Sequence, residues 1–97
     1  MERKIVYTPE ALEGIEQAAL WLEENASLQA AQNLLDSIAQ LESRLAKYPE
    51  SGRPTGSENI RYLIVTKHKV LYYRYTAKTI RVLALFDTRQ DPKKRPY

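Results

Sequence analysis

Residues 60–86 have the sequence IRYLIVTKHKVLYYRYTAKTIRVLALF, and this stretch decides the fold. It contains three runs rich in β-branched and aromatic residues, which are typical of β-strands. These runs are residues 60–66, 70–75 and 79–86. The connections between the runs are short enough for hairpins, so the stretch predicts an antiparallel three-stranded region.

The apolar content of this stretch is higher than a half-exposed sheet needs. Residues 70–73 and 82–86 form nearly continuous apolar or aromatic runs without alternation. Such runs are typical of strands that are covered on both faces. Helices can cover one face, and the second cover could be the C-terminal tail, a second copy of the chain or a segment of a partner.

The N-terminal half predicts a helical hairpin of residues 9–24 and 28–47. Thr8-Pro9-Glu10 is typical of a helix start, because Thr caps well and Pro suits the first helical position. Ser27 is the second N-cap candidate, and the apolar residues that follow it recur at alternating steps of three and four. The short turn between the helices makes them antiparallel neighbours. Trp21 is interpreted as a core or interface aromatic residue.

Three shorter segments complete the chain. Residues 4–7 can form a first strand, and residues 87–97 form a basic tail. Residues 49–57 are predicted to form a loop, because they hold two of the five prolines and two of the three glycines. We therefore predict a single domain over residues 1–97 of the α+β class, with the helical hairpin packed on a small, mainly antiparallel sheet.

The charge of the chain is divided between its halves. Residues 1–48 hold four Lys/Arg and eight Asp/Glu, a net of −4, and residues 49–97 hold eleven and four, a net of +7, which together give the overall +3. The basic half also contains five of the seven tyrosines. This composition suits phosphate groups or an acidic protein partner, although strand cations can also be plain solvated positions.

Several functional classes are excluded or unsupported by composition. The chain has no cysteine, which excludes disulfides and thiolate chemistry, and its carboxylates are scattered, so we predict no metal site and no cofactor. The single histidine, His68, lies in a predicted turn, where it is more often a surface residue than a catalyst. The N-terminus lacks the apolar core of a signal peptide and no run could span a bilayer, which predicts a cytoplasmic protein without a membrane partner.

The basic residues could carry RNA cleavage if an acid and a base meet among them. Attack by the 2′-hydroxyl needs a base, an acid for the leaving oxygen, and cations on the phosphorane. Crowded cations lower a lysine pKa, so Lys67 or Lys69 could act as the base. Arg61 or Arg89 could hold the phosphate, and Tyr97 could act as the acid.

The order of the segments resembles the RelE/ParE superfamily of bacterial type II toxin–antitoxin toxins over residues 4–92. Tyr-Thr-Pro-Glu-Ala at residues 7–11 enters the hairpin, and residues 48–54, YPESGRP, are similar to the family's aromatic-Pro-x-x-Gly-Arg-Pro loop. Residues 68–74, HKVLYYR, resemble its YRIFYRV run, and residues 87–92, DTRQDP, resemble its HGRRDP ending.

This resemblance implies a growth-inhibiting toxin, of the kind found in plasmid stabilization modules, that is neutralised by a cognate antitoxin. The antitoxin of such a pair wraps the toxin, and the pair commonly represses its own operon, so operator DNA is contacted through the antitoxin complex. RelE-like members enter the ribosome and cut mRNA, whereas ParE-like members inhibit DNA gyrase and are not nucleases.

The resemblance also implies roles for individual basic residues. Lys69 and Arg89 fall where RelE-like toxins have important arginines, and Arg61 lies in the region of their basic strand residues, together with Lys67. Tyr97 matches a tyrosine of these toxins if a few extra residues are allowed. Asp87 stands where many relatives have histidine, and an acid at that position would repel phosphate.

The long helices followed by the Pro-x-x-Gly-Arg-Pro loop look more like the ParE branch, so gyrase inhibition is the preferred function. The alternative is a ribosome-dependent mRNA endoribonuclease that uses Arg89, Lys69, Arg61 and Tyr97, and a further alternative is a non-toxic domain that binds an antitoxin or nucleic acid. We expect a net-acidic, amphipathic antitoxin segment to cover the apolar strand residues and pair with the strand arginines. The predicted target- or antitoxin-binding residues are Arg53, Lys67, Arg74, Arg81, Tyr72, Tyr73, Lys93, Lys94 and Arg95.

Overall fold

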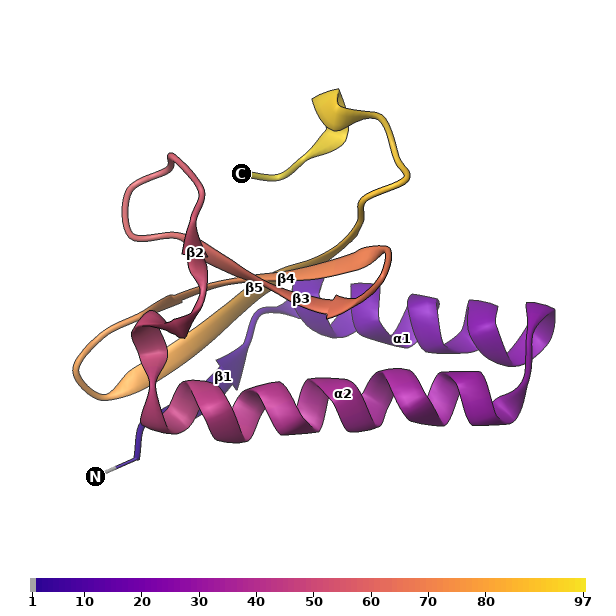
Figure 1. The fold of residues 1–97 in the computed structure, drawn as a ribbon, viewed down its shortest axis with the longest axis horizontal. Helices are drawn as coiled ribbons and strands as arrows, with labels where there is room; N and C mark the ends of the chain where they lie inside the picture. The colour runs from indigo at the N-terminus through magenta and orange to yellow at the C-terminus, as the bar shows by residue number, and fades with distance from the viewer. Residues whose placement is uncertain (1) are drawn as a thin grey trace.

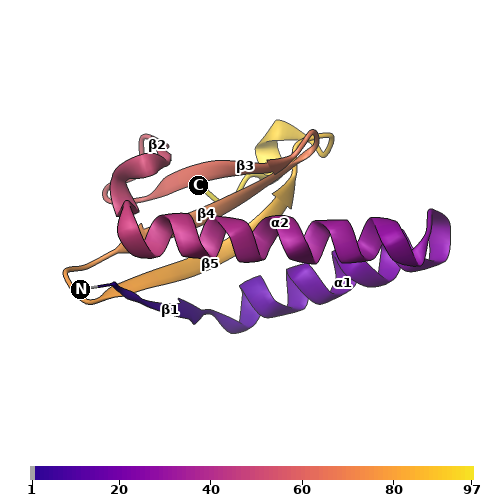
Figure 2. The ribbon, with the colours of Figure 1, turned by 60° about the horizontal axis from the view of Figure 1, so that its bottom comes forward.

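Two long helices lie side by side on one face of a five-stranded sheet in the computed structural model, which describes residues 2–97 (Figures 1 and 2). The strand order is β1-β5-β4-β3-β2. This arrangement confirms the predicted α+β class. The elements are β1 (Lys4–Tyr7), α1 (Pro9–Asn25), α2 (Leu28–Lys47), the 3₁₀ helix η1 (Pro49–Ser51), β2 (Arg53–Pro54), β3 (Arg61–Thr66), β4 (Lys69–Tyr75), β5 (Thr79–Asp87) and the 3₁₀ helix η2 (Pro92–Lys94).

The first strand joins the last one. β1 pairs with β5 in parallel, from Lys4 opposite Thr79 to Tyr7 opposite Val82, and the other three neighbouring pairs are antiparallel. A parallel pair needs a long crossover, and the helical hairpin with β2, β3 and β4 supplies it. The first strand therefore forms one edge of the sheet, and the last strand lies directly inside it.

Both helices begin at the predicted caps. The Thr8 hydroxyl accepts a hydrogen bond from the Ala11 amide at 3.1 Å, and the Ser27 hydroxyl accepts one from the Ala30 amide at 2.9 Å. Pro9 occupies the start of α1, where its missing N–H costs nothing. Across residues 2–97, neither the length nor the apolar composition of any helix is sufficient to cross a bilayer.

β5 contains a bulge at Leu83. The neighbouring Val82 and Ala84 pair with consecutive residues of β4, so Leu83 is an extra residue in its strand. Thr8 satisfies the backbone at this point: its amide donates to the Val82 carbonyl at 3.0 Å, and its hydroxyl donates to the Leu83 carbonyl at 3.0 Å. One residue thus caps α1 and closes the bulge.

The bulge shifts the alternation of side chains along β5. Val82 and Leu85 pack under the helices, whereas Leu83 and Phe86 belong to a cluster on the opposite face of the sheet, here called the outer face. The continuous apolar run at residues 82–86 therefore has two causes, because it is covered on both faces and it also changes phase within the strand.

The C-terminal tail supplies the second cover. On the outer face, Val70 and Tyr72 are buried together with the two residues from β5. The ring of Tyr97 lies over Tyr72, with 5.4 Å between their centroids. Of the three covers that the sequence allows, the tail is the one present in this structure.

The segment predicted as a loop at residues 49–57 is more ordered than expected, since it contains η1 and β2. The buried Tyr73 hydroxyl holds it: it donates to the Pro49 carbonyl at 2.7 Å and accepts from the Gly52 amide at 2.8 Å. A Cβ at Gly52 would lie 2.5 Å from that oxygen. The glycine is therefore required by close approach to Tyr73.

We expect Thr8→Ala to destabilise the fold more than Ser27→Ala. Each change removes a helix cap worth about 0.5–2 kcal/mol. Thr8→Ala also leaves the Leu83 carbonyl without its side-chain donor, which adds about 1–3 kcal/mol. Urea unfolding of the two variants measures the difference, and equal losses would contradict the role of Thr8 at the bulge.

Tyr73→Phe tests the anchor of residues 49–52. The change removes one hydroxyl and leaves the Pro49 carbonyl and the Gly52 amide unpaired, so we expect a loss of about 1–3 kcal/mol of unfolding free energy. Tyr75→Phe is the matched control, because no hydrogen bond of the Tyr75 hydroxyl is present within residues 2–97. Thermal unfolding that ranks both variants equally would refute this assignment.

Candidate functional site

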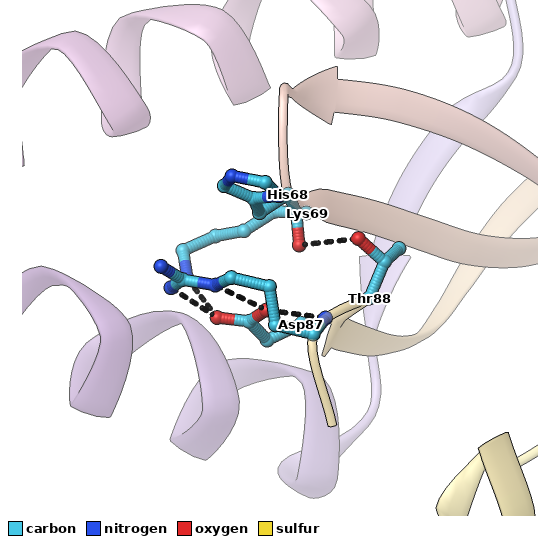
Figure 3. A network of polar contacts seen from close by, with 5 residues as sticks. His68, Lys69, Asp87 and Thr88 are labelled. Carbon is cyan, nitrogen blue, oxygen red and sulfur yellow. Dashed lines mark hydrogen bonds and ion pairs between the residues drawn. The ribbon is translucent and has the colours of Figure 1, made fainter. Parts of the chain in front are cut away.

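A carboxylate holds two cations at the end of β5. Asp87 Oδ2 lies 2.7 Å from Arg89 Nη2 and 3.4 Å from Lys69 Nζ. The Arg89 side chain makes a second contact, from Nε to Asp87 Oδ1 at 3.1 Å. Lys69 and Asp87 are register partners in the β4–β5 pair, so their side chains share one face and converge (Figure 3).

The backbone around Asp87 is fixed to the turn between β3 and β4. The Arg89 amide donates to Asp87 Oδ1 at 2.9 Å. The His68 carbonyl accepts from the Thr88 amide at 2.7 Å and from the Thr88 hydroxyl at 3.3 Å (Figure 3). The chain leaving β5 is therefore tied to the β3–β4 turn, and separating Arg89 from Asp87 breaks three hydrogen bonds.

These contacts keep Asp87 ionised. The hydrogen bond from the Arg89 side chain holds the pKa of the Asp87 carboxyl well below its usual range; partial burial opposes this effect, and the Arg89 amide and Lys69 add to it. The same carboxylate raises the pKa of Arg89. At neutral pH Asp87 is thus a permanent counter-ion and is too weak a base to accept a proton in catalysis.

A groove lies beside this cluster, between α1 and the β3–β4 turn. Trp21, Lys69 and Arg89 line two adjoining hollows of about 410 Å³ and 340 Å³. Trp21 is 55% exposed, so its interpretation as a core residue is wrong, while the interface interpretation stays a prediction. An exposed indole beside a guanidinium and an ammonium suits contact with a partner rather than packing within the chain.

The four residues proposed for RNA cleavage are not brought together. Arg61 lies at the opposite end of β3 from the β3–β4 turn, where its guanidinium donates to the carbonyls of Gly52 at 2.8 Å and Glu50 at 3.3 Å. Tyr97 lies over the outer face of the sheet. Lys69 and Arg89 remain as a pair, both bound to a carboxylate. Lys67, the other candidate base, lines a separate hollow of about 430 Å³ with Tyr97, and neither Arg61 nor Arg89 lines that hollow.

The predicted binding residues divide into accessible and inaccessible ones. Tyr73 is fully buried and anchors η1, and Tyr72 is buried beneath Tyr97, so neither is open to a partner in this arrangement and their contact with one stays a prediction. The exposed members are Arg53, Lys67, Arg74, Arg81, Lys93, Lys94 and Arg95. No group of three His, Asp or Glu side chains within residues 2–97 could hold a metal ion.

A protein family described as "ParE toxin of type II toxin-antitoxin system, parDE" matches residues 5–92. The chain belongs to this family. It is therefore a toxin of the RelE/ParE superfamily, as the sequence motifs predict. No curated protein matches the chain.

Solved structures share the fold of this ParE-family toxin. The chromosomal ParDE system from P. aeruginosa superposes with a TM-score of 0.75 at 16% identity, covering 89% of this chain and 96% of that one. The YoeB/ParE toxin from Agrobacterium tumefaciens gives 0.65 at 16% identity, over 87% and 96%. The E. coli DinJ–YafQ toxin–antitoxin complex gives 0.63 at 13% identity, over 92% and 96%. At these identities the likeness is one of fold.

We expect Asp87→Asn to destabilise this ParE-family toxin by about 1–3 kcal/mol at pH 7, because it leaves the largely buried Lys69 without a counter-ion. A carboxyl whose pKa is depressed by folding stabilises the protein above its unfolded pKa of about 4 and loses that effect as pH falls below it. The deficit of the variant should therefore shrink as pH falls from about 5 towards 3.

Urea unfolding at several pH values measures this dependence. Asp91→Asn is the matched control, because Asp91 is exposed and accepts from the Lys93 amide without contacting a cation within residues 2–97. A deficit for Asp87→Asn that is constant with pH would show that its ionisation is irrelevant.

Proposed function

We propose that this toxin arrests growth by inhibiting DNA gyrase and does not cleave mRNA. The observation that carries the proposal is the binding of Asp87 to both Lys69 and Arg89. An incoming phosphate would have to displace an ionised carboxylate from both cations and would be repelled by it. A surface that contacts another protein has no such requirement.

The dispersal of the remaining candidates supports the same proposal. General acid–base cleavage needs both groups within hydrogen-bond reach of one phosphodiester. Arg61 is used by the carbonyls of residues 50 and 52, and Tyr97 lies on the other face of the sheet from Lys69. Arg61 therefore serves the fold and Tyr97 lies apart from Lys69 and Arg89, although Tyr97 and Lys67 line one hollow.

The surroundings of the groove favour the alternative of mRNA cleavage. The Arg89 guanidinium is half exposed, and it lies with Lys67, His68 and the exposed Trp21 around the groove. An aromatic ring beside cations is an arrangement that also suits unpaired bases and phosphates. For this reason the test measures both gyrase inhibition and mRNA cleavage with the same variant, Arg89→Ala.

The proposed function includes a cognate antitoxin. The chain belongs to a family of toxins from type II toxin–antitoxin systems, and the DinJ–YafQ structure that shares its fold is a toxin–antitoxin complex. We propose that an antitoxin binds this toxin and that operator DNA is contacted through that complex.

The purified toxin should block gyrase supercoiling at micromolar concentration, and Arg89→Ala should block it equally, because the proposed action needs no phosphate clamp. Primer extension on translated messages after induction should show no new cleavage. Undisturbed gyrase would end the proposal.

Two other outcomes separate the alternatives. Cleavage of mRNA that Arg89→Ala removes and Arg89→Lys partly restores would establish the nuclease instead. Harmless expression without any partner would show a domain that has lost toxicity.

A further inference from the structure

Five cations gather at the end of the sheet where β4 turns into β5. Parallel pairing of β1 with β5 places two residues from the acidic half beside three from the basic half: the Lys4 amide donates to the Lys78 carbonyl at 3.0 Å, and Arg3 Nε donates to the Thr76 carbonyl at 2.7 Å. We call this cluster the basic end. Its members are Arg3, Lys4, Arg74, Lys78 and Arg81.

Arg74 and Arg81 are directly opposite each other in the antiparallel β4–β5 pair. Both side chains are exposed, and they point to the outer face because their neighbours Tyr73 and Val82 pack under the helices. Like charges at directly opposite positions destabilise a sheet. The fold therefore bears a cost at this pair.

Nothing within residues 2–97 compensates this cost. The ion pairs there are Glu2–Lys47, Lys69–Asp87 and Arg89–Asp87, and none of them involves the basic end. Arg3 has a structural use, since its guanidinium bonds a carbonyl and lies 5.7 Å from the ring centre of Tyr75. The side chains of Arg74 and Arg81 make no comparable contact within the described residues.

An apolar strip begins next to the two arginines. Tyr72 precedes Arg74 by two residues on the outer face, and Leu83 follows Arg81 by two, so both lie one row further along the same surface. Both side chains are buried in this structure, with Tyr97 of the tail over Tyr72, so a segment seated on the arginines would reach them by taking the place of the tail. Two guanidinium groups beside a tail-covered apolar strip are complementary to an amphipathic acidic segment.

We infer that Arg74 and Arg81 form a clamp for carboxylates of an acidic, amphipathic segment of the antitoxin, an inference that rests on the antitoxin partner of the proposed function. A peptide fits better than nucleic acid, because the basic end has no free aromatic ring for base stacking: Tyr73 is buried and the Tyr75 ring is faced by Arg3. Arginine forks bind carboxylates in pairs of parallel hydrogen bonds.

The test uses the full chain and the double variant Arg74→Ser with Arg81→Ser. Removing the repulsion should raise the melting temperature of the free protein by about 2–5 °C. The same variant should bind an alternating glutamate–leucine peptide about tenfold more weakly, with a shallower salt dependence. Wild-type protein should prefer this peptide to poly-L-glutamate, and both to oligothymidylate of equal length.

Lys93→Ser with Lys94→Ser is the matched control, because it removes the same charge from exposed positions of the tail. It should change neither the melting temperature nor peptide binding appreciably. The inference is overturned if the control weakens peptide binding as much as the arginine variant, if oligothymidylate binds as tightly as the peptide, or if the arginine variant binds the peptide like wild type. Gyrase is not a readout in this test, so failure of the gyrase proposal leaves these results unchanged.

Discussion

The contact between Thr8 and the bulge in β5 is the constraint on which the rest of the structure depends. Thr8 caps α1 while its amide and hydroxyl take the carbonyls of Val82 and Leu83. The extra residue changes which side chains of β5 face the helices from that point onward. Without it Asp87 would point to the outer face, and Lys69 would have no carboxylate. A backbone irregularity thus assembles the charged cluster.

Local chemistry makes much of the fold predictable. Thr8, Pro9 and Ser27 determine where the helices begin, because capping depends on residues next to one another in sequence. The pairing of β1 with β5 and the bulge at Leu83 are different, since each depends on segments far apart in the chain. No periodicity in residues 79–87 marks the extra residue, and the apolar run there is equally consistent with cover on both faces.

The candidate site is less predictable, because composition indicates which residues are charged but not which groups those residues contact. The sequence identifies Asp87 as an acid that opposes phosphate, yet its simultaneous contact with Lys69 and Arg89 depends on strand register. In the sequence Arg61 cannot be told from any surface arginine, although its guanidinium donates hydrogen bonds to backbone carbonyls. Similarly, Arg3 and Lys4 belong to the acidic half of the chain but lie at the basic end of the sheet.

The parallel pair of β1 and β5 also determines when folding of the chain can be completed. Thr8 and Leu83 are 75 residues apart in sequence, and contacts of such separation form late because a long loop must close first. On the ribosome the helical hairpin emerges early, but β1 has no strand to join until residues 79–82 have been synthesised. The edge of the sheet formed by β1 is therefore completed late, after the other elements have been synthesised.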